Sequence, residues 1–260
     1  MKRTLILMML LTVPAHAGAW MQQEGSGLSI TTLSYGRALR AFDANGKPIS
    51  AVPYLRGERR HYFEFGLYEN LTLIANSGEV VDDWFDGSER GLAEYWGPRD
   101  IGMRMRIYEG DGTAISLEHS LHLPASARLQ IERGLGPDTR SLETRLLVGH
   151  GFTLLGVPIF IESEAAYRYR LGQANDEVAL DFVLGVTPFE DWQLLAQSFN
   201  TIGMNSYLGY ASMYRENKLQ LSAVYQVTDR VSFQLGGYRT IAGEGVAEEE
   251  GILAAMWVRY

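Results

Sequence analysis

The sequence predicts an all-β fold: a closed antiparallel transmembrane β-barrel of about 12 strands, preceded by a cleaved signal peptide. Three observations predict this fold. An apolar segment with a basic start opens the chain, apolar and polar residues then alternate in about twelve segments, and the connections between these segments are short and long in turn. Successive side chains of a strand point to opposite faces, so sustained alternation indicates a wall with one apolar and one polar face.

The first 17 residues are typical of a secretory signal peptide. Two basic residues precede the apolar run Leu5–Val13, and Ala15 and Ala17 are the small residues that a signal peptidase requires. A transmembrane helix would need about 20 apolar residues, so this run is too short to be one. We therefore expect cleavage after Ala17 and a barrel over residues 18–260.

The composition limits the classes of function. The 260 residues include 23 Lys and Arg against 31 Asp and Glu, and Lys2 and Arg3 leave with the signal peptide. Phosphate backbones are bound by clustered cations, so we expect no nucleic-acid partner. Cysteine is absent, which fits export through an oxidising compartment without reliance on disulfides.

The predicted strands follow from strict alternation, which is clearest in the fourth. In residues 99–108, Ile101 and Met103 fall on one face and Arg104 and Arg106 on the other. A helical period would mix these arginines with the methionines. Twelve segments alternate in this way, an even number, as a barrel with both termini at one end requires. The predicted strands are residues 28–42, 54–67, 71–81, 99–108, 113–123, 140–149, 157–171, 176–187, 192–199, 215–227, 231–240 and 251–260.

The middle strands are separated by recognisable turns. Residues 113–123 follow a tight turn at 109–112, whose Gly and Asp supply the left-handed torsions of a hairpin. Residues 176–187 and 215–227 each keep one apolar face, and Pro158 is expected at a strand start or a bulge. Longer polar segments alternate with these turns and are predicted to be extracellular loops. They are residues 43–53, 82–98, 124–139, 200–214 and 241–250.

The last strand is apolar on one face up to the end of the chain. Ile252, Ala254, Met256, Val258 and Tyr260 share this face. A barrel in a bilayer must pair its last strand with its first, because unpaired backbone groups are costly in lipid. We expect outer-membrane lipid and lipopolysaccharide to contact the exterior, and the barrel-assembly machinery to bind the strand that ends in Tyr260.

The polar faces carry the candidate functional residues. Charged side chains inside a barrel either pair with one another as a structural network or form a constriction that selects solutes by their charge. Both interpretations stay open at this point. Arg60 and Glu64 share the polar face with the predicted constriction. The constriction consists of Arg104, Arg106, Glu118, Glu143, Arg145, Glu162, Glu164, Arg168, Arg170 and Asp181.

Acidic residues also gather in two predicted loops. Hard divalent cations prefer oxygen ligands, but the acids here have no fixed ligand spacing, so the sequence predicts solvated loops, no metal site and no cofactor. The acids are Glu79, Asp82, Asp83, Asp86 and Glu89 in the first cluster and Glu244, Glu248, Glu249 and Glu250 in the second.

A membrane-embedded lipid hydrolase is the enzymatic alternative. Such a site needs a His and a Ser on one face, two residues apart, so that the imidazole can act as base for the hydroxyl. Ser120 and His122 share a face, but that face points inward. His119 interrupts the apolar face, and the sequence offers no reason for it. We therefore predict that the protein is not an enzyme.

Several stretches beyond the leader carry a family resemblance. They are residues 18–20 with 23–27, 64–67 with 71–73, 194–201, and 218–225 with 228–230. Over nearly the whole mature chain the sequence resembles the XagA-like outer-membrane proteins, which are related to the barrel and transporter family named for the meta-pathway of phenol degradation. The resemblance implies an outer-membrane barrel with polysaccharide-export components among its partners, and it implies no catalytic residues.

These observations favour a channel or transporter in the outer membrane of a Gram-negative cell. It would pass a small or extended hydrophilic solute through a charged narrow lumen. A non-conducting structural or accessory barrel for surface polysaccharide export is the main alternative. A soluble β-domain of two stacked sheets is a third.

Overall fold

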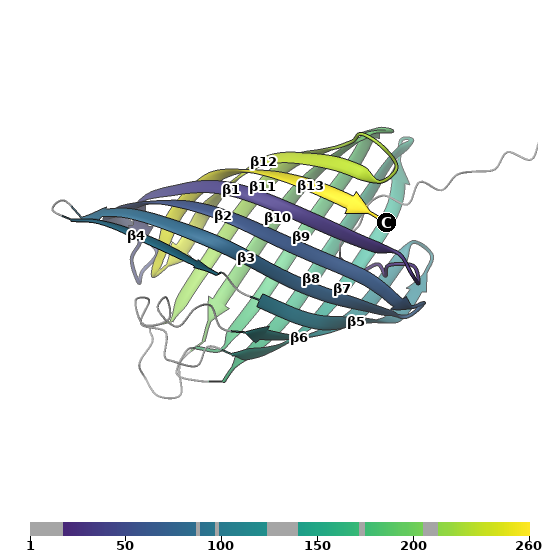
Figure 1. Ribbon diagram of the computed structural model, residues 1–260, viewed down its shortest axis with the longest axis horizontal. Helices are drawn as coiled ribbons and strands as arrows, with labels where there is room; N and C mark the ends of the chain where they lie inside the picture. The colour runs from purple at the N-terminus through teal and green to yellow at the C-terminus, as the bar shows by residue number, and fades with distance from the viewer. Residues whose placement is uncertain (1–17, 87–88, 97–98, 124–139, 172–174, 205–212) are drawn as a thin grey trace, which may run out of the picture.

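A computed structural model describes residues 18–86, 89–96, 99–123, 140–171, 175–204 and 213–260. In these residues, thirteen strands form one sheet that closes on itself (Figure 1). The strands are β1 (Gly27–Phe42), β2 (Pro48–Tyr68), β3 (Leu71–Asp86), β4 (Glu89–Trp96), β5 (Arg99–Gly110), β6 (Thr113–Leu123), β7 (Ser141–Leu154), β8 (Val157–Arg170), β9 (Glu177–Phe189), β10 (Trp192–Gly203), β11 (Tyr214–Gln226), β12 (Val231–Glu244) and β13 (Val246–Arg259).

The thirteen strands make a twelve-stranded barrel. β1 pairs antiparallel with both β2 and β13, which closes the ring. β4 and β5 both pair with β3, β4 along residues 79–86 and β5 along residues 71–76. β4 and β5 therefore follow each other along the same edge of β3 and together count as one strand of the ring. The predicted closed antiparallel barrel of twelve strands is confirmed, and two stacked sheets are excluded.

Two predicted loops are strands instead. Residues 82–98 contain the end of β3 and all of β4, and in residues 241–250 only Gly245 separates β12 from β13. Ion pairs between strands stabilise the second hairpin, because Glu248 lies 2.9 Å from Arg40 and 2.7 Å from Arg239. Polarity on both faces suggested a loop, but strands that leave the membrane can be polar on both faces. The predicted loop 124–139 and the signal peptide lie outside the described residues.

The outer face of the barrel is apolar. Met103, Leu221 and Ile252 expose 52%, 66% and 67% of their surface, while the alternate residues Leu253 and Trp257 are buried inside. The predicted faces of the last strand are thus confirmed. A soluble monomer rarely exposes so large an apolar area, whereas a bilayer covers it. Among the described residues, no helix is both long and apolar enough to cross a membrane.

Three histidines on this outer face bond to threonines of neighbouring strands. Thr hydroxyls lie within hydrogen-bond distance of each imidazole Nδ1, so the polar ring atom has a partner at the exposed face. This arrangement explains His119, which the sequence left unexplained. The pairs are His61 with Thr31 at 3.1 Å, His119 with Thr144 at 3.0 Å and His150 with Thr113 at 2.8 Å.

The two ends of the barrel differ. Short turns gather at one end, which we call the turn end, at residues 69–70, 111–112, 155–156, 190–191 and 227–230. The C-terminus lies at this end too, on the right of Figure 1. At the opposite end, the loop end, β3 and β4 extend furthest. Outer-membrane barrels direct short turns and termini to the periplasm, which assigns the turn end to that side.

Candidate functional site: the barrel lumen

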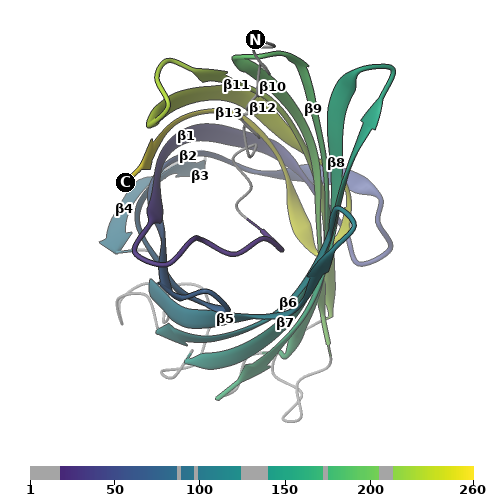
Figure 2. The ribbon, with the colours of Figure 1, turned by 90° about the vertical axis from the view of Figure 1, so that its right-hand side faces the viewer.

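The residues that precede β1 lie inside the barrel. Figure 2 looks into the turn end, where the purple chain leading into β1 crosses the ring. We call residues 18–26 the N-terminal segment. Its backbone is fixed to Gly66 of β2: Gly25 N donates to Gly66 O at 2.9 Å, and Gly66 N donates to Ser26 O at 2.9 Å.

Three further hydrogen bonds hold the segment to the inner wall. Ala19 N donates to Glu162 Oε2 of β8 at 2.7 Å. Gln22 Nε2 donates to Glu64 Oε2 of β2 at 2.6 Å, and Gln22 N donates to Thr72 Oγ1 of β3 at 3.2 Å. The segment therefore bonds to groups on both sides of the lumen.

Trp20 joins the segment to an apolar core inside the barrel. Its ring stands edge-on to that of Phe160, with centroids 6.0 Å apart and planes at 90°. Two buried clusters meet at Trp20: Ala19, Ala114 and Leu147 on one side, and Leu28, Phe160, Leu195, Val224, Ala255 and Trp257 on the other. Apolar side chains thus pack across the interior near the turn end, and a cavity of about 820 Å³ lined by Trp20, Arg106 and Tyr260 remains beside the segment.

Two inward-facing glycines make room for the segment. A Cβ on Gly149 of β7 would stand 2.5 Å from the Trp20 ring, and a Cβ on Gly66 would overlap the carbonyl oxygen of Gln23. Sequence reasoning missed this closure. Glycines at inward positions near the turn end are the signal that could have indicated it, because a glycine in a strand often marks a close approach of other atoms.

The charged network of the lumen begins at Arg104 of β5. This guanidinium is 3% exposed and pairs with Glu64 at 2.8 Å and with Glu118 at 3.0 Å. Tyr62 donates its hydroxyl to Glu64 and lies 3.3 Å from Arg104 Nη2. Each buried charge here has a partner of opposite sign, as buried ions require.

A second cluster surrounds Arg145 of β7. Its guanidinium pairs with Glu143 at 3.0 Å, with Asp181 at 3.1 Å, and with Glu164. One arginine thus bridges three carboxylates on β7, β8 and β9.

Glu143 and Glu177 extend the network toward the loop end. Arg168 pairs with Glu143 at 2.7 Å and with Glu177 at 2.6 Å. Arg170 and the hydroxyl of Tyr214 also contact Glu177. The prediction omitted Glu177, which lies at the start of β9, where its inward direction depends on the register of that strand.

The structure brings together nine of the ten predicted constriction residues along the wall formed by β5–β9. Arg106 is the exception. It lies at the turn end, where it pairs with Glu109 and donates to the carbonyl oxygen of Glu69 at 2.6 Å. Alternation placed Arg106 on the correct face, but the position of the adjoining turn decides its depth in the barrel.

The opposite wall carries side-chain amides. Gln197 of β10 and Gln220 of β11 share a hydrogen bond of 2.8 Å between their side chains. Gln234 of β12 donates to Ser222 at 2.8 Å and accepts from Trp257 Nε1 at 3.0 Å. The same wall also carries the ion pairs Lys218–Glu216 at 3.4 Å and Arg56–Glu249 at 3.7 Å, so charged groups line both sides of the lumen and the amides interrupt them on one side.

Ser120, His122 and Asp100 form a Ser–His–Asp arrangement in the lumen. Ser120 Oγ lies 3.2 Å from His122 Nε2, and Asp100 Oδ1 lies 2.6 Å from His122 Nδ1. However, Glu143 Oε2 lies 3.5 Å from the same Nε2. An imidazole that donates to a carboxylate from each nitrogen has no lone pair to accept the serine proton. The contacts favour an ion-pair role for His122.

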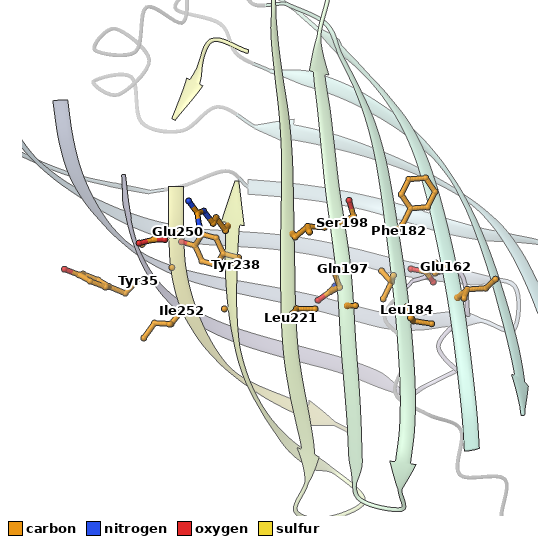
Figure 3. A pocket seen from close by; sticks show the side chains of 18 of the residues that line it. Tyr35, Glu162, Phe182, Leu184, Gln197, Ser198, Leu221, Tyr238, Glu250 and Ile252 are labelled. Carbon is orange, nitrogen blue, oxygen red and sulfur yellow. The ribbon is translucent and has the colours of Figure 1, made fainter. Parts of the chain in front are cut away.

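A shallow groove of about 1170 Å³ crosses the barrel wall over β8–β13 and β1 (Figure 3). Exposed apolar side chains such as Leu184, Leu221 and Ile252 border it, and small residues such as Ala196 and Gly237 widen it. These residues belong to the outer face, which lipid covers, whereas Glu162, Gln197 and Tyr238, which also line the groove, belong to the inner face.

Comparisons with known proteins agree with the fold. No protein-family model matches the chain, and no curated protein is similar to it in sequence. Among solved structures, the COG4313 outer membrane channel from Pseudomonas putida F1 is similar with a TM-score of 0.70, at 11% identity, over 95% of this chain and 99% of that one.

Two further solved structures share the barrel. The NanC porin has a TM-score of 0.54 at 9% identity, over 88% of this chain and 98% of its own. The translocator domain of the autotransporter NalP from Neisseria meningitidis has a TM-score of 0.51 at 10% identity, over 92% and 90%. The chain therefore has the fold of an outer-membrane β-barrel. This fold is shared by a channel, a porin and a translocator domain, so the function must be argued from the lumen.

Proposed function

We propose that this protein is an outer-membrane channel for small hydrophilic solutes and that its N-terminal segment closes the turn end. The closure carries the proposal. Twelve strands enclose a polar lumen, and the element that crosses it at the turn end is not a strand of the wall but a short segment. Hydrogen bonds to Glu64, Gly66, Thr72 and Glu162, together with the packing of Trp20, hold this segment. Such a segment can leave without breaking the barrel.

The charges of the lumen favour a weak preference for cations. In the network over β5–β9 with Glu64 of β2, four arginines face seven carboxylates, so this network carries an excess of negative charge when all are ionised, whereas the pairs Lys218–Glu216 and Arg56–Glu249 of the opposite wall balance each other. Both signs lie on the same wall and pair with one another, which keeps the field across the lumen small. The groups are Arg104, Arg145, Arg168 and Arg170 against Glu64, Glu118, Glu143, Glu162, Glu164, Glu177 and Asp181.

The amides of the lumen support a hydrophilic solute. The side-chain amides of Gln197 and Gln220 can both donate and accept hydrogen bonds, and they can exchange their mutual bond for bonds to a solute hydroxyl. An uncharged polar solute or a small cation can therefore pass along these amides.

Planar-bilayer recordings test the proposal. The wild-type protein is expected to show rare or small openings, and Trp20→Ala is expected to show a several-fold larger mean conductance, because the segment loses its apolar anchor. Under a salt gradient the reversal potential of both should indicate cation preference. Leu221→Ala, which shortens an apolar side chain on the outer face, is the matched control and should behave as wild type. Silence of both the wild type and Trp20→Ala would reject the channel.

The apolar core around Trp20 favours one second candidate, a permanently closed accessory barrel for surface polysaccharide export. The resemblance to XagA-like proteins points the same way. This candidate requires that Trp20→Ala stays silent in bilayers and that cells without the protein lose surface polysaccharide. Cells producing Trp20→Ala would then export normally, because the lumen would play no part.

A further inference from the structure

Glu162 is a buried carboxylate without a cationic partner in the described part of the chain. Its side chain is 3% exposed, and none of the ion pairs among the described residues includes it. Its carboxyl interacts with that of Glu164, which already pairs with Arg145. A buried carboxylate beside a second one needs a positive charge to remain ionised.

The N-terminal segment brings its first residue to this carboxylate. Ala19 N donates to Glu162 Oε2 at 2.7 Å, and a Cβ on Gly18 would overlap both carboxylate oxygens. The main chain of Gly18 therefore lies directly against the carboxylate.

We propose that removal of the leader between Ala17 and Gly18 creates an ammonium group that pairs with Glu162 and latches the N-terminal segment inside the lumen. Signal peptidase adds water across the Ala17–Gly18 bond: the carbonyl carbon of Ala17 takes the hydroxyl, and the nitrogen of Gly18 takes the hydrogen. The new amine takes one more proton from solvent. A neutral amide with one N–H becomes a cation with three donors at the carboxylate that lacks a cation.

This latch ties processing to closure. A chain that keeps its leader has no charge at Gly18. Charge-assisted hydrogen bonds are about twice as strong as neutral ones, so processing strengthens the contact between the segment and β8. The segment is then held most strongly in the mature protein.

The amine itself provides the first test, which does not depend on conduction. Mature protein purified from outer membranes should begin at Gly18 by N-terminal sequencing. The mature chain then has three amines, the N-terminus, Lys47 and Lys218, because Lys2 leaves with the leader. Acylation followed by mass spectrometry can therefore resolve each one. The Gly18 amine should react several-fold more slowly in wild type than in Glu162→Gln, while Lys47 reacts equally in both.

Conductance provides the second test. Glu162→Gln keeps the size of the side chain and an acceptor for Ala19 N but removes the charge, so it should open more often than wild type. Insertion of one alanine before Gly18 displaces the ammonium and should have the same effect. Glu250→Gln, which neutralises an exposed carboxylate on the outer face of β13, is the control. Heat-modifiable gel mobility establishes that each variant is folded.

Either of two results would overturn the latch. One is a mature N-terminus other than Gly18. The other is a Gly18 amine that reacts equally fast in wild type and Glu162→Gln. If amine protection holds but no variant conducts, the latch stands and the channel function fails.

Discussion

At the scale of single residues, Arg104 holds the lumen together more than it selects solutes. Two carboxylates, Glu64 and Glu118, depend on it for charge compensation, and almost no surface of its side chain is exposed. A solute can reach only groups that are accessible, so the selectivity of the lumen must come from less buried residues of the same wall, such as Arg168.

Replacement of Arg104 is therefore expected to destabilise the barrel. Arg104→Met leaves two carboxylates without their cation, and breaking a buried ion pair in this way costs about 3–5 kcal/mol. Urea unfolding in lipid vesicles measures the free energy of unfolding. The triple variant with Glu64→Gln and Glu118→Gln should recover most of the loss, because no uncompensated charge remains. A neutral effect of Arg104→Met alone would contradict the role assigned to it.

At the scale of elements, the N-terminal segment depends on the shape of β7 as much as on its own residues. The inner face of β7 lacks a side chain at Gly149, directly beneath the Trp20 ring. The strand is therefore built to receive the segment. An added side chain at this place should expel the ring without altering the pairing of β7 with its neighbours.

Gly149→Val tests this element. The valine would occupy the space of the Trp20 ring, so we expect a several-fold increase in mean conductance and stronger quenching of tryptophan fluorescence by a soluble quencher. Gly57→Val is the matched control, since Gly57 lies on the outer face of β2, where an added Cβ would have no atom within 4 Å. Equal conductance of Gly149→Val and Gly57→Val would argue against a seat for Trp20 on β7.

At the scale of the whole molecule, the two faces of the sheet meet different surroundings. Leu221 faces outward at 66% exposure, and its neighbour Gln220 faces the lumen. A charge on the outer face would have to enter the hydrocarbon of the bilayer, whereas a charge on the inner face meets water and polar groups.

Arginine substitutions at these two neighbours should therefore differ in cost. Leu221→Arg is expected to lower the free energy of unfolding in vesicles by about 2–4 kcal/mol if it lies near the bilayer midplane. Gln220→Arg should have a smaller effect on stability and should instead change the ion selectivity of the lumen. Equal costs at the two positions would show that the outer face of β11 does not contact lipid.

The sequence by itself determined the barrel. Alternation is a local property of each strand, so it indicated the number of strands, the apolar face that ends with Tyr260, and the inward direction of Glu143, Arg145 and Arg168. It misassigned residues 82–98 and 241–250 as loops, because strands outside the membrane do not need an apolar face.

Only the tertiary structure decided which inward residues meet. The pairing register and the curvature of the closed sheet place His122 beside Asp100, bring Glu177 to Arg168, and leave Arg106 at the turn end. They also make the lumen wide enough to hold the N-terminal segment. No alternation marks residues 18–26 as part of the interior, because the contacts of this segment lie across the barrel and are far apart in the chain.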